Sequence, residues 1–597
     1  MPLTLADAAE PTDTLAELQS DARAVYWLAR STQTGSMQLW QWRAESNKPP
    51  CCVIENAVGS RVNQYGGGSY TLLLDSILWV RQHDQAIMQL DHRGADHCWQ
   101  KRPKTAYGGL CADPKRQRII VVEEDQQGQR LVAFTDCKRT DNNRQVLAEG
   151  ADFYGAAVLS DDGNYLAWVS WSLPHMPWQR SQLHLARVTA TGKLDLSEHW
   201  DFGAAISQPQ FGPRNALICM SDHAGWWQPW QVNLTTPLCL SNAPVDHITT
   251  PWQLGERQHA WRNDRQLYCQ LHQGAAQLYR HCGQQVEALL PTPGRVASIA
   301  LAKHGDYAIV QSATCGAQLI CFTANHPNRY LAGNVTNGLV TKNPAIAQWL
   351  ETPVGKKGET VHGFFYSASV SAHRIAPLIV RVHGGPTAAT YPIYDPLVAY
   401  WQQQGFHVLD INPRGSGNFG RRYRECLAGQ WGISDTDDVI ALVNAACARF
   451  AIDTTRCFIR GQSAGGFTAL NALITTPLFA AATSLYGVTD ALTLAAQTHR
   501  FESGYLSWLI GERPLLARRS PAYQITRCQR PLRALFIQGG KDAVVVPEQT
   551  QAMARYIEKQ EGRAKTLLFD NEYHGIRHPY ARQTMLASEL AFYQQDG

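Results

Sequence analysis

The sequence lacks a long uninterrupted hydrophobic run, although 44% of its 597 residues are hydrophobic. No apolar stretch approaches the roughly 18 to 20 residues that a membrane-spanning helix needs. The first twenty residues, MPLTLADAAEPTDTLAELQS, carry acidic side chains where a signal peptide has a basic start and an apolar stretch. We therefore expect a cytoplasmic protein that has no membrane partner.

The sequence also lacks a strong excess of charge. Its 54 lysines and arginines stand against 50 aspartates and glutamates, a net charge of +4, and no long basic run is present. Proteins that bind nucleic acids concentrate basic residues on one face or in one segment. Nucleic acid is therefore not an expected partner.

The fifteen cysteines form no paired pattern. Only Cys51 and Cys52 are adjacent, and no C-x-x-C pair occurs. This spacing argues against a disulfide framework and against a zinc site. Cysteines scattered in this way are typical of small buried residues in a reducing compartment, and the sequence implies no metal or organic cofactor.

The chain is too long for one ordinary domain, and its first 330 residues or so have a repeating pattern. Seven short apolar or β-branched bursts recur at spacings of 41 to 51 residues. They are AVYWLA near Tyr26, YTLLL near Leu72, RIIVVEE near Ile120, YLAWVSW near Ala167, NALICMS near Ile218, RQLYCQL near Leu267 and DYAIVQS near Ala308. Units of this length with several short strands are typical of propeller blades, which cover each other's faces. We predict a seven-bladed β-propeller, with an irregular β-sandwich or a solenoid as the alternative.

From about Trp349 onward, apolar strands alternate with helical stretches, which indicates a mostly parallel sheet with crossover helices. The predicted strands are 377–383, 406–412, 455–461, 481–487, 531–539 and 564–570. Between the second and third, apolar residues repeat at helical spacing. Ser434 and Asp437 there resemble a capping box at the start of that helix.

The pentapeptide Gly461-Gln462-Ser463-Ala464-Gly465 matches the pattern G-x-S-x-G. It directly follows the strand CFIRG and directly precedes the helical stretch FTALNALI. A nucleophile elbow has this context, because small residues on both sides let the serine hydroxyl stand clear of the sheet. We predict Ser463 as a catalytic nucleophile.

A serine nucleophile needs a base and a carboxylate that orients the base. In this topology the acid and then the histidine follow later strands. Asp542 comes after the strand ALFIQG, and His574 comes after TLLFD, at the sheet edge where open α/β folds place their sites. His578, next to Pro579, is expected to be a cap or surface residue, and Asp570 ends its strand too early to serve the base.

The segment His383-Gly384-Gly385-Pro386 follows the first predicted strand of the second domain. Such a glycine loop lets a backbone N–H approach the oxyanion of a tetrahedral intermediate, and the N–H of Ala464 would be the second donor. His383 is expected to orient the loop, because His574 already occupies the position of the base.

These motifs, in this order, resemble the prolyl oligopeptidase family of serine peptidases, and within it the acylaminoacyl-peptidase and dipeptidyl-aminopeptidase-like members. The resemblance is carried by VHGGP, NPRGSGNFGRRYRE, QWGISDTDDV, RGQSAGGFTALNAL, YGVTDALTLAAQTHRFESGYL, QGGKDAVVVPEQ and YHGIRHP, and in the first half by QYGGGSY, SWSLPHMPWQRSQL and SDHAGWWQPW. It implies a β-propeller with a short N-terminal extension over residues 1–335 and an α/β-hydrolase peptidase domain over 340–597, joined near 329–348.

The resemblance also implies roles for single residues: Ser463, Asp542 and His574 as the triad, with Gly385 and Ala464 as the oxyanion donors. In this family the propeller restricts entry to short peptides. One departure is Tyr573, which stands where the family has a glycine before its histidine, and which is expected to narrow the site without moving the imidazole.

The bond that is cut depends on how the substrate's amino end is bound. An aminopeptidase needs a carboxylate facing the free ammonium, whereas an acylaminoacyl peptidase lacks one. Glu502 is the leading candidate, with a structural salt bridge to Arg500 or Arg414 as the alternative. A weaker candidate is the pair Glu123-Glu124, because strand alternation points these side chains to opposite faces.

Three aromatic residues, Tyr486, Tyr505 and Trp508, are candidates for the pocket that holds the side chain before the scissile bond, with simple packing as the alternative. The predicted function is hydrolysis of short peptides near their N-terminus through an acyl-enzyme. An esterase or amide hydrolase acting on a small aminoacyl compound, such as an aminoacylated antibiotic, is the alternative, followed by a non-catalytic propeller interaction protein. A homo-oligomer is compatible with the sequence, which leaves the oligomeric state open.

Overall fold

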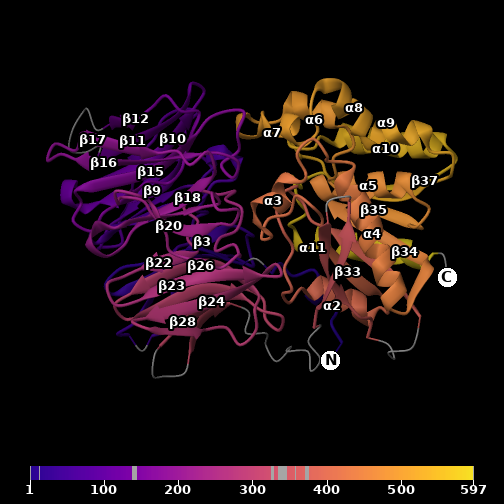
Figure 1. Cartoon of the computed structure of the whole chain (residues 1–597), viewed down its shortest axis with the longest axis horizontal. Helices are drawn as coiled ribbons and strands as arrows, with labels where there is room; N and C mark the ends of the chain where they lie inside the picture. Colours follow the sequence, from indigo (N-terminus) through magenta and orange to yellow (C-terminus); the bar gives the residue numbers. More distant parts are fainter. Residues whose placement is uncertain are drawn as a thin grey trace.

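The structure is a computed structural model that describes residues 2–12, 14–46, 48–136, 144–323, 328–333, 346–355, 358–369 and 375–595. Within these residues the strands form seven small antiparallel sheets and one eight-stranded, mostly parallel sheet. Figure 1 shows the small sheets, coloured indigo to magenta, on one side of the molecule and the large sheet with its helices, coloured orange to yellow, on the other. The predicted fold class, a seven-bladed β-propeller followed by an α/β-hydrolase domain, is confirmed.

Each blade of the propeller is one continuous stretch of chain. The first three blades contain β1 (Leu15–Ser20), β2 (Ala24–Arg30), β3 (Met37–Arg43) and β4 (Cys51–Ile54); β5 (Tyr70–Leu73), β6 (Ser76–Val80), β7 (Ile87–Leu90) and β8 (Asp96–Gln100); and β9 (Ala106–Asp113), β10 (Arg118–Asp125), β11 (Gly128–Thr135) and β12 (Arg144–Ala148). The fourth and fifth contain β13 (Phe153–Tyr154), β14 (Val158–Leu159), β15 (Tyr165–Trp171), β16 (Gln182–Val188) and β17 (Leu194–Trp200); and β18 (Ile206–Phe211), β19 (Leu217–Ser221), β20 (Gln228–Gln231) and β21 (Leu238–Cys239). The last two contain β22 (His259–Trp261), β23 (Gln266–His272), β24 (Ala275–Cys282) and β25 (Gln285–Ala288); and β26 (Arg295–Ala302), β27 (Gly305–Gln311), β28 (Gln318–Phe322) and β29 (Arg329–Gly333). Short 3-10 turns join strands at η1 (Val62–Gln64), η2 (Pro114–Arg116) and η3 (Pro213–Asn215).

The apolar bursts of the sequence form an inner, buried strand of each blade, namely β2, β5, β10, β15, β19, β23 and β27. Most of these strands are apolar because neighbouring blades cover their faces, whereas β23 alternates buried with partly exposed residues. The ring closes by side-chain packing between the first and last blades, where Trp27 and Trp42 share a core with Tyr307 and Leu319.

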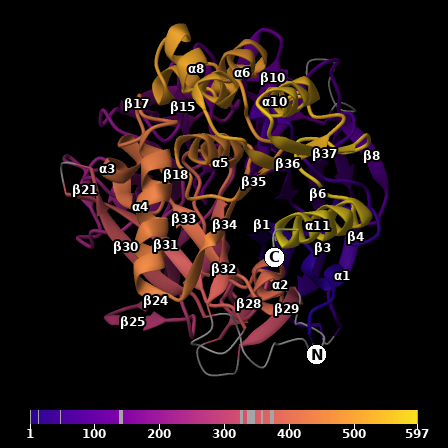
Figure 2. The same cartoon turned by 90° about the vertical axis from the view of Figure 1, so that its right-hand side faces the viewer.

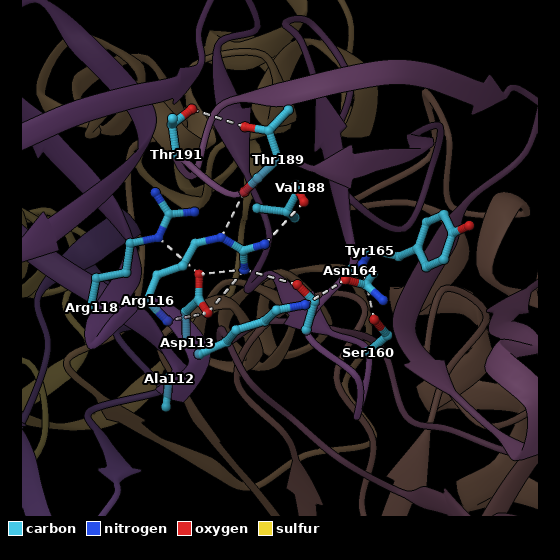
Figure 3. A network of polar contacts seen from close by, with 12 residues as sticks. Ala112, Asp113, Arg116, Arg118, Ser160, Asn164, Tyr165, Val188, Thr189 and Thr191 are labelled. Atoms are coloured by element: carbon cyan, nitrogen blue, oxygen red, sulfur yellow. Dashed lines mark hydrogen bonds and ion pairs between the residues drawn. The ribbon is translucent and has the colours of Figure 1, made fainter.

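A buried polar network ties the third blade to the fourth (Figure 3). Arg116 donates to the backbone carbonyls of Val188 and Thr189 at 2.9 and 2.8 Å, and its guanidinium pairs with Asp113 at 3.2 Å. Arg118 donates to the same carboxylate at 2.8 Å. Because the side chain of Asp113 is fully buried, its charge is balanced by these two arginines rather than by water.

The large sheet has the order β30-β31-β33-β32-β34-β35-β36-β37, parallel from β33 onward. Its strands are β30 (Gln348–Val354), β31 (Glu359–Tyr366), β32 (Ala376–Val382), β33 (His407–Asn412), β34 (Ile452–Gln462), β35 (Ala481–Leu485), β36 (Arg533–Gly539) and β37 (Arg563–Phe569). One face is covered by α4 (Ser434–Arg449), α5 (Ala464–Thr475) and α10 (Pro547–Lys559), and the other by α2 (Pro396–Gln403) and α11 (Pro579–Gln594). The connections contain α3 (Gly420–Glu425), α6 (Ala491–Gln497), η4 (Arg500–Glu502), α7 (Tyr505–Leu509), α8 (Arg513–Arg519), α9 (Pro521–Gln524) and η5 (Ile525–Arg527). Among the described residues, every helix is too short or too polar to span a bilayer.

The six strands predicted in the second domain correspond to β32 through β37. The predicted capping box is wrong. Ser434 is the first residue of α4, the N-cap residue is Ile433, and no side chain caps this end of the helix. The neighbouring Asp435 is instead buried, where it accepts from the Gly432 N–H at 2.6 Å and from the Thr468 hydroxyl at 2.5 Å. The acidic residue at this helix start therefore holds α4 to α5.

The short helix α1 (Leu5–Ala8) packs on the hydrolase domain, although it precedes the propeller in the chain. Figure 2 shows it beside α2 and α11. The Leu3 N–H donates to the Gln403 side chain at 2.8 Å, and the Arg582 side chain donates to the carbonyl of Ala9. The propeller thus lies between two segments of chain that both pack in the hydrolase domain; residues 334–345, where the predicted domain boundary falls, lie outside the described residues.

A buried ion pair joins the two domains. Asp222, directly after β19, pairs with Arg424 of α3, and neither side chain is more than 3% exposed. Asp222 also accepts from the Ala205 N–H at 2.9 Å, and Arg424 also donates to the carbonyl of Trp178 at 3.1 Å. Both charges are therefore compensated only by protein groups.

Asp222→Ala is expected to lower the free energy of unfolding by about 3–5 kcal/mol, because it leaves the Arg424 charge buried without its partner. Denaturant unfolding of the two-domain protein would measure this. The control is Asp195→Ala, since the Arg187–Asp195 pair is about half exposed and is worth no more than about 1 kcal/mol. Equal shifts in the two variants would contradict the prediction.

Candidate active site

Ser463 lies on a sharp turn between β34 and α5. Its backbone has φ 52° and ψ −119°, a conformation that non-glycine residues rarely adopt. A Cβ on Gly461 would lie 2.0 Å from the Gly465 carbonyl oxygen, and a Cβ on Gly465 would lie 2.3 Å from that of Val382. The turn therefore needs glycine at both flanking positions, as a nucleophile elbow does.

Ser463, His574 and Asp542 form a continuous hydrogen-bonded chain. Nε2 of His574 lies 2.9 Å from the Ser463 hydroxyl, and Nδ1 of His574 lies 2.9 Å from Oδ2 of Asp542. Oδ1 of Asp542 accepts from the backbone N–H groups of Val544 and Val545, both at 2.9 Å. The buried Asp542 carboxylate is thus held in one orientation.

The three residues of the chain come from loops at the carboxyl ends of β34, β36 and β37, which meet at one edge of the sheet. The carboxylate that meets His574 is that of Asp542 and not that of Asp570. His578 is an exposed residue at the N-terminus of α11. The arrangement brings together the same three residues that strand order indicated.

The glycine loop after β32 lies next to the elbow. Gly385 has φ 69°, and Ala464 is the first residue of α5, so its N–H has no partner within the helix. His383 is directed to the Ser416 hydroxyl, 2.8 Å from Nε2. Burial lowers the pKa of His383 to about 4, so this imidazole is neutral at physiological pH and is bonded within the loop region rather than to Ser463.

Tyr505 and Trp508 stack on each other, with ring centroids 5.9 Å apart. The Tyr505 hydroxyl is 2.9 Å from that of Thr387, and its ring lies edge-on to Trp252 of the propeller at 6.0 Å. Trp252 reaches within 3.7 Å of where a Cβ of Gly385 would stand. An aromatic wall built from both domains therefore begins at the glycine loop.

Tyr486 contacts a different set of groups from Tyr505 and Trp508. Its ring lies edge-on to His574 at 5.0 Å, and its hydroxyl donates to the Gln462 side chain at 3.1 Å. Burial raises the pKa of Tyr486, so its hydroxyl stays protonated. Tyr486 therefore lies on the side of the imidazole.

Glu502, in η4, faces the propeller. Its carboxylate accepts from the Tyr65 hydroxyl at 2.5 Å and lies 3.7 Å from Nε2 of His499. Burial lowers the pKa of His499, so this histidine is not a permanent cation. The Glu502 side chain, 17% exposed, thus lies at the domain interface in contact with Tyr65 and His499.

The alternative partners of Glu502 are engaged elsewhere. Arg500 pairs with Asp152, and Arg414 pairs with Asp438 and Glu359 at 2.7 and 3.2 Å. The two adjacent glutamates of β10 point to opposite faces, as strand alternation predicts. Glu123 is buried and pairs with Arg144 at 2.6 Å, whereas Glu124 accepts from the Asn63 N–H at 2.7 Å.

A cavity of about 760 Å³ lies between the two domains. It is lined by Tyr65 and Trp252 from the propeller, and by His383, Gly384, Gln462 and Tyr486 from the hydrolase domain. The propeller residues could not be found from sequence spacing, because only the ring of blades brings them to the elbow. The motif QYGGGSY is the one signal that pointed toward Tyr65.

The centre of the propeller is closed on the side of the site. Two loops cross there: the Leu254 N–H donates to the Gly66 carbonyl at 2.9 Å, and the Gly109 N–H donates to the Gly67 carbonyl at 3.1 Å. The space that remains at the centre is about 100 Å³, and Phe501 of the hydrolase domain lines it. In the described part of the chain, these contacts therefore obstruct the propeller axis on the side of Ser463.

The fold and this site define a propeller-capped α/β-hydrolase with a Ser-His-Asp hydrogen-bonded chain. Residues 394–596 match the model of the prolyl oligopeptidase family, so the resemblance inferred from the sequence motifs is confirmed.

Among curated proteins, the chain is similar to dipeptidyl peptidase family member 6 of Caenorhabditis elegans, with 30% identity over 213 residues, and to acylamino-acid-releasing enzyme 2 of Oryza sativa subsp. japonica, with 27% identity over 233 residues. These matches cover 34% and 36% of this chain but only 28% and 29% of the two relatives. Among solved structures, it is similar to a Mycobacterium tuberculosis puromycin-hydrolyzing peptidase, with 26% identity, a TM-score of 0.91, and coverage of 100% of this chain and 96% of the other.

Proposed function

We propose that this protein is a serine peptidase that hydrolyses short peptides near their N-terminus. The observation that carries the proposal is the hydrogen-bonded chain from Ser463 through His574 to Asp542, with 2.9 Å at both links. The names of the similar proteins support a peptidase.

In the proposed mechanism, the Ser463 hydroxyl attacks the scissile carbonyl while His574 Nε2 takes its proton. The N–H groups of Gly385 and Ala464 stabilise the oxyanion that forms. His574 then gives the proton to the leaving amine, and the C–N bond breaks to leave an acyl-enzyme. A water molecule, deprotonated by the same imidazole, releases the acyl group and restores Ser463.

Short substrates are favoured because the site opens into a cavity enclosed by two domains, and because the propeller axis is closed. Tyr505 contacts Thr387 and Trp252, which line this cavity, and Tyr505 and Trp508 are the proposed wall for the side chain before the scissile bond. Glu502 is the proposed partner of a free substrate ammonium, because it has no permanent cation of its own.

Glu502→Gln is expected to lower kcat/KM for an aminoacyl or dipeptidyl anilide about 10- to 100-fold, the value of a hydrogen bond to a charged group. The N-acetylated anilide, which carries no ammonium, should be hydrolysed more slowly than the free amine by the wild-type enzyme and should be little affected by the substitution. Glu558→Gln, on the exposed face of α10, is the matched control. Faster cleavage of the acetylated anilide would instead support an acylaminoacyl peptidase.

The second candidate is hydrolysis of a small aminoacyl amide or ester. It is favoured by the similarity over the whole chain to a structure described as a puromycin-hydrolyzing peptidase. Ester and amide acyl transfer need the same triad, so substrate choice separates the two functions. Turnover of aminoacyl esters without turnover of any dipeptide or longer peptide would support this second candidate.

A further inference from the structure

Two arginines line the cavity on the side of His574. Arg577 follows the proposed base by three residues, and its Nε lies 3.9 Å from where a Cβ of Gly575 would stand. Arg582 lies in the first turn of α11. Both side chains line the cavity together with Tyr486, so two positive charges lie at its edge beside the imidazole.

Tyr486 lies near these two arginines and near the imidazole of His574. Its ring lies 5.0 Å from that of His574, and the charges of Arg460, Arg582 and Arg577 all act on its hydroxyl. The guanidinium groups of Arg577 and Arg582 therefore lie on the Tyr486 side of the imidazole. The aromatic wall of Tyr505 and Trp508 belongs to a different core of the domain.

The other buried arginines of the cavity already have acidic partners. Arg381 pairs with Asp395 at 2.7 Å and with Asp410 at 3.0 Å, and Arg460 pairs with Glu589 at 2.8 Å. These pairs neutralise the floor of the cavity. Glu10 and Glu256 also line the cavity.

Arg577 and Arg582 are different, because neither has a carboxylate within 4.0 Å in the part of the chain that the structure describes. Arg582 donates to the backbone carbonyls of Ala9 and Glu10, which carry no charge. The Arg577 side chain is exposed at the mouth. The charges of Asp395 and Glu10 act on Arg582 from beyond that distance. Two cations that line one cavity without a directly paired carboxylate form a place for an anionic group.

The proposed mechanism indicates which part of a substrate lies near Arg577 and Arg582. His574 protonates the leaving amine, so the leaving fragment must pass beside its imidazole. Each extended residue spans about 3.3–3.6 Å, and a leaving fragment of one or two residues ends in a carboxylate within a few ångströms of that point. We propose that Arg577 and Arg582 form a subsite for the C-terminal carboxylate of a short peptide substrate; this inference rests on the proposed peptidase function.

The test compares a peptide free acid with its C-terminal amide, at the same sequence. In the wild-type enzyme the free acid should have a kcat/KM about tenfold higher, the order of a charge-assisted hydrogen bond, and the difference should lie mainly in KM. Arg577→Gln should lower this ratio to near one, while Arg582→Lys, which keeps the charge, should retain most of it. Arg555→Gln, on the exposed face of α10, should leave both the ratio and the basal activity unchanged.

Equal hydrolysis of acid and amide by the wild-type enzyme would overturn the proposal. So would an Arg577→Gln variant that slows both substrates by the same factor, because such a variant acts on the site as a whole. A result that contradicts the proposed peptidase function can be distinguished from these two outcomes. It would appear as no cleavage of any peptide or anilide and no reaction of Ser463 with a fluorophosphonate.

Discussion

Ser463→Ala is expected to lower kcat about a millionfold, as loss of the nucleophile does in serine protease triads. The alanine keeps the turn between β34 and α5 but removes the oxygen that lies 2.9 Å from His574. The substitution deletes one hydroxyl and fills no space, so the unfolding temperature should stay close to that of the wild type. Turnover of an anilide or peptide, together with thermal unfolding, would measure both effects.

The matched control is Ser503→Ala, whose hydroxyl is exposed and bonds only to the carbonyl of Arg500. It should retain full activity. A fluorophosphonate should label the wild type and the control but not Ser463→Ala. Turnover by Ser463→Ala at the wild-type rate would exclude the proposed acyl-enzyme mechanism.

Asp542→Asn is expected to lower kcat about ten-thousandfold, as replacement of the triad aspartate does. The surroundings of Asp542 fix the outcome. The N–H groups of Val544 and Val545 both point at Oδ1, and only the longer 3.2 Å bond from Gln538 reaches Oδ2. An asparagine should therefore keep its oxygen at the two N–H groups, lose the bond from Gln538, and turn its NH₂ toward His574. Nδ1 of the imidazole would then accept, the proton would move to Nε2, and Nε2 could no longer take the proton of Ser463.

Asp570→Asn is the control for this prediction, because Asp570 directly follows β37 and is not part of the hydrogen-bonded chain. It should change kcat less than threefold, within the range of a surface substitution. A loss of similar size in both variants would indicate a general disturbance of the sheet edge. A loss of only a few-fold in Asp542→Asn would show that another group orients His574.

The parts of the fold that could be predicted are those in which burial requires a run of apolar residues in the sequence. Most inner strands of the blades and β32 through β36 are apolar because their faces are covered, and these strands were predicted. β37 was predicted as well, although it lies at the edge of the sheet and is partly exposed. The first two strands of the hydrolase sheet were missed. β30 lies at its edge and alternates buried with exposed residues, and β31 beside it begins with polar residues such as His362. The capping box failed because Asp435, and not Ser434, makes the buried contacts at the start of α4.

The residues of the site were also predictable only in part. Ser463, Asp542 and His574 each follow a strand, so chain order and sheet topology were enough to group them. The partners from the propeller were not predictable, since nothing local to Tyr65 or Trp252 indicates that the ring of blades carries them to Glu502 and Gly385. Arg577 and Arg582 could be identified as cations from the sequence. Only the structure shows that neither has a carboxylate within 4.0 Å among the described residues.

The packing of α1 on the hydrolase domain limits how the two domains can move relative to each other. The polypeptide crosses between the domains twice, once after α1 and once between Gly333 and Gln348. The first crossing is held by the packing of α1 against α2 and α11, so the propeller is tethered to the hydrolase domain there. Residues 10–12, at the first crossing, also line the cavity, and the gap there must stay nearly constant. Any swing would open the cavity widest at the edge farthest from these residues, so a peptide would enter and leave on that side.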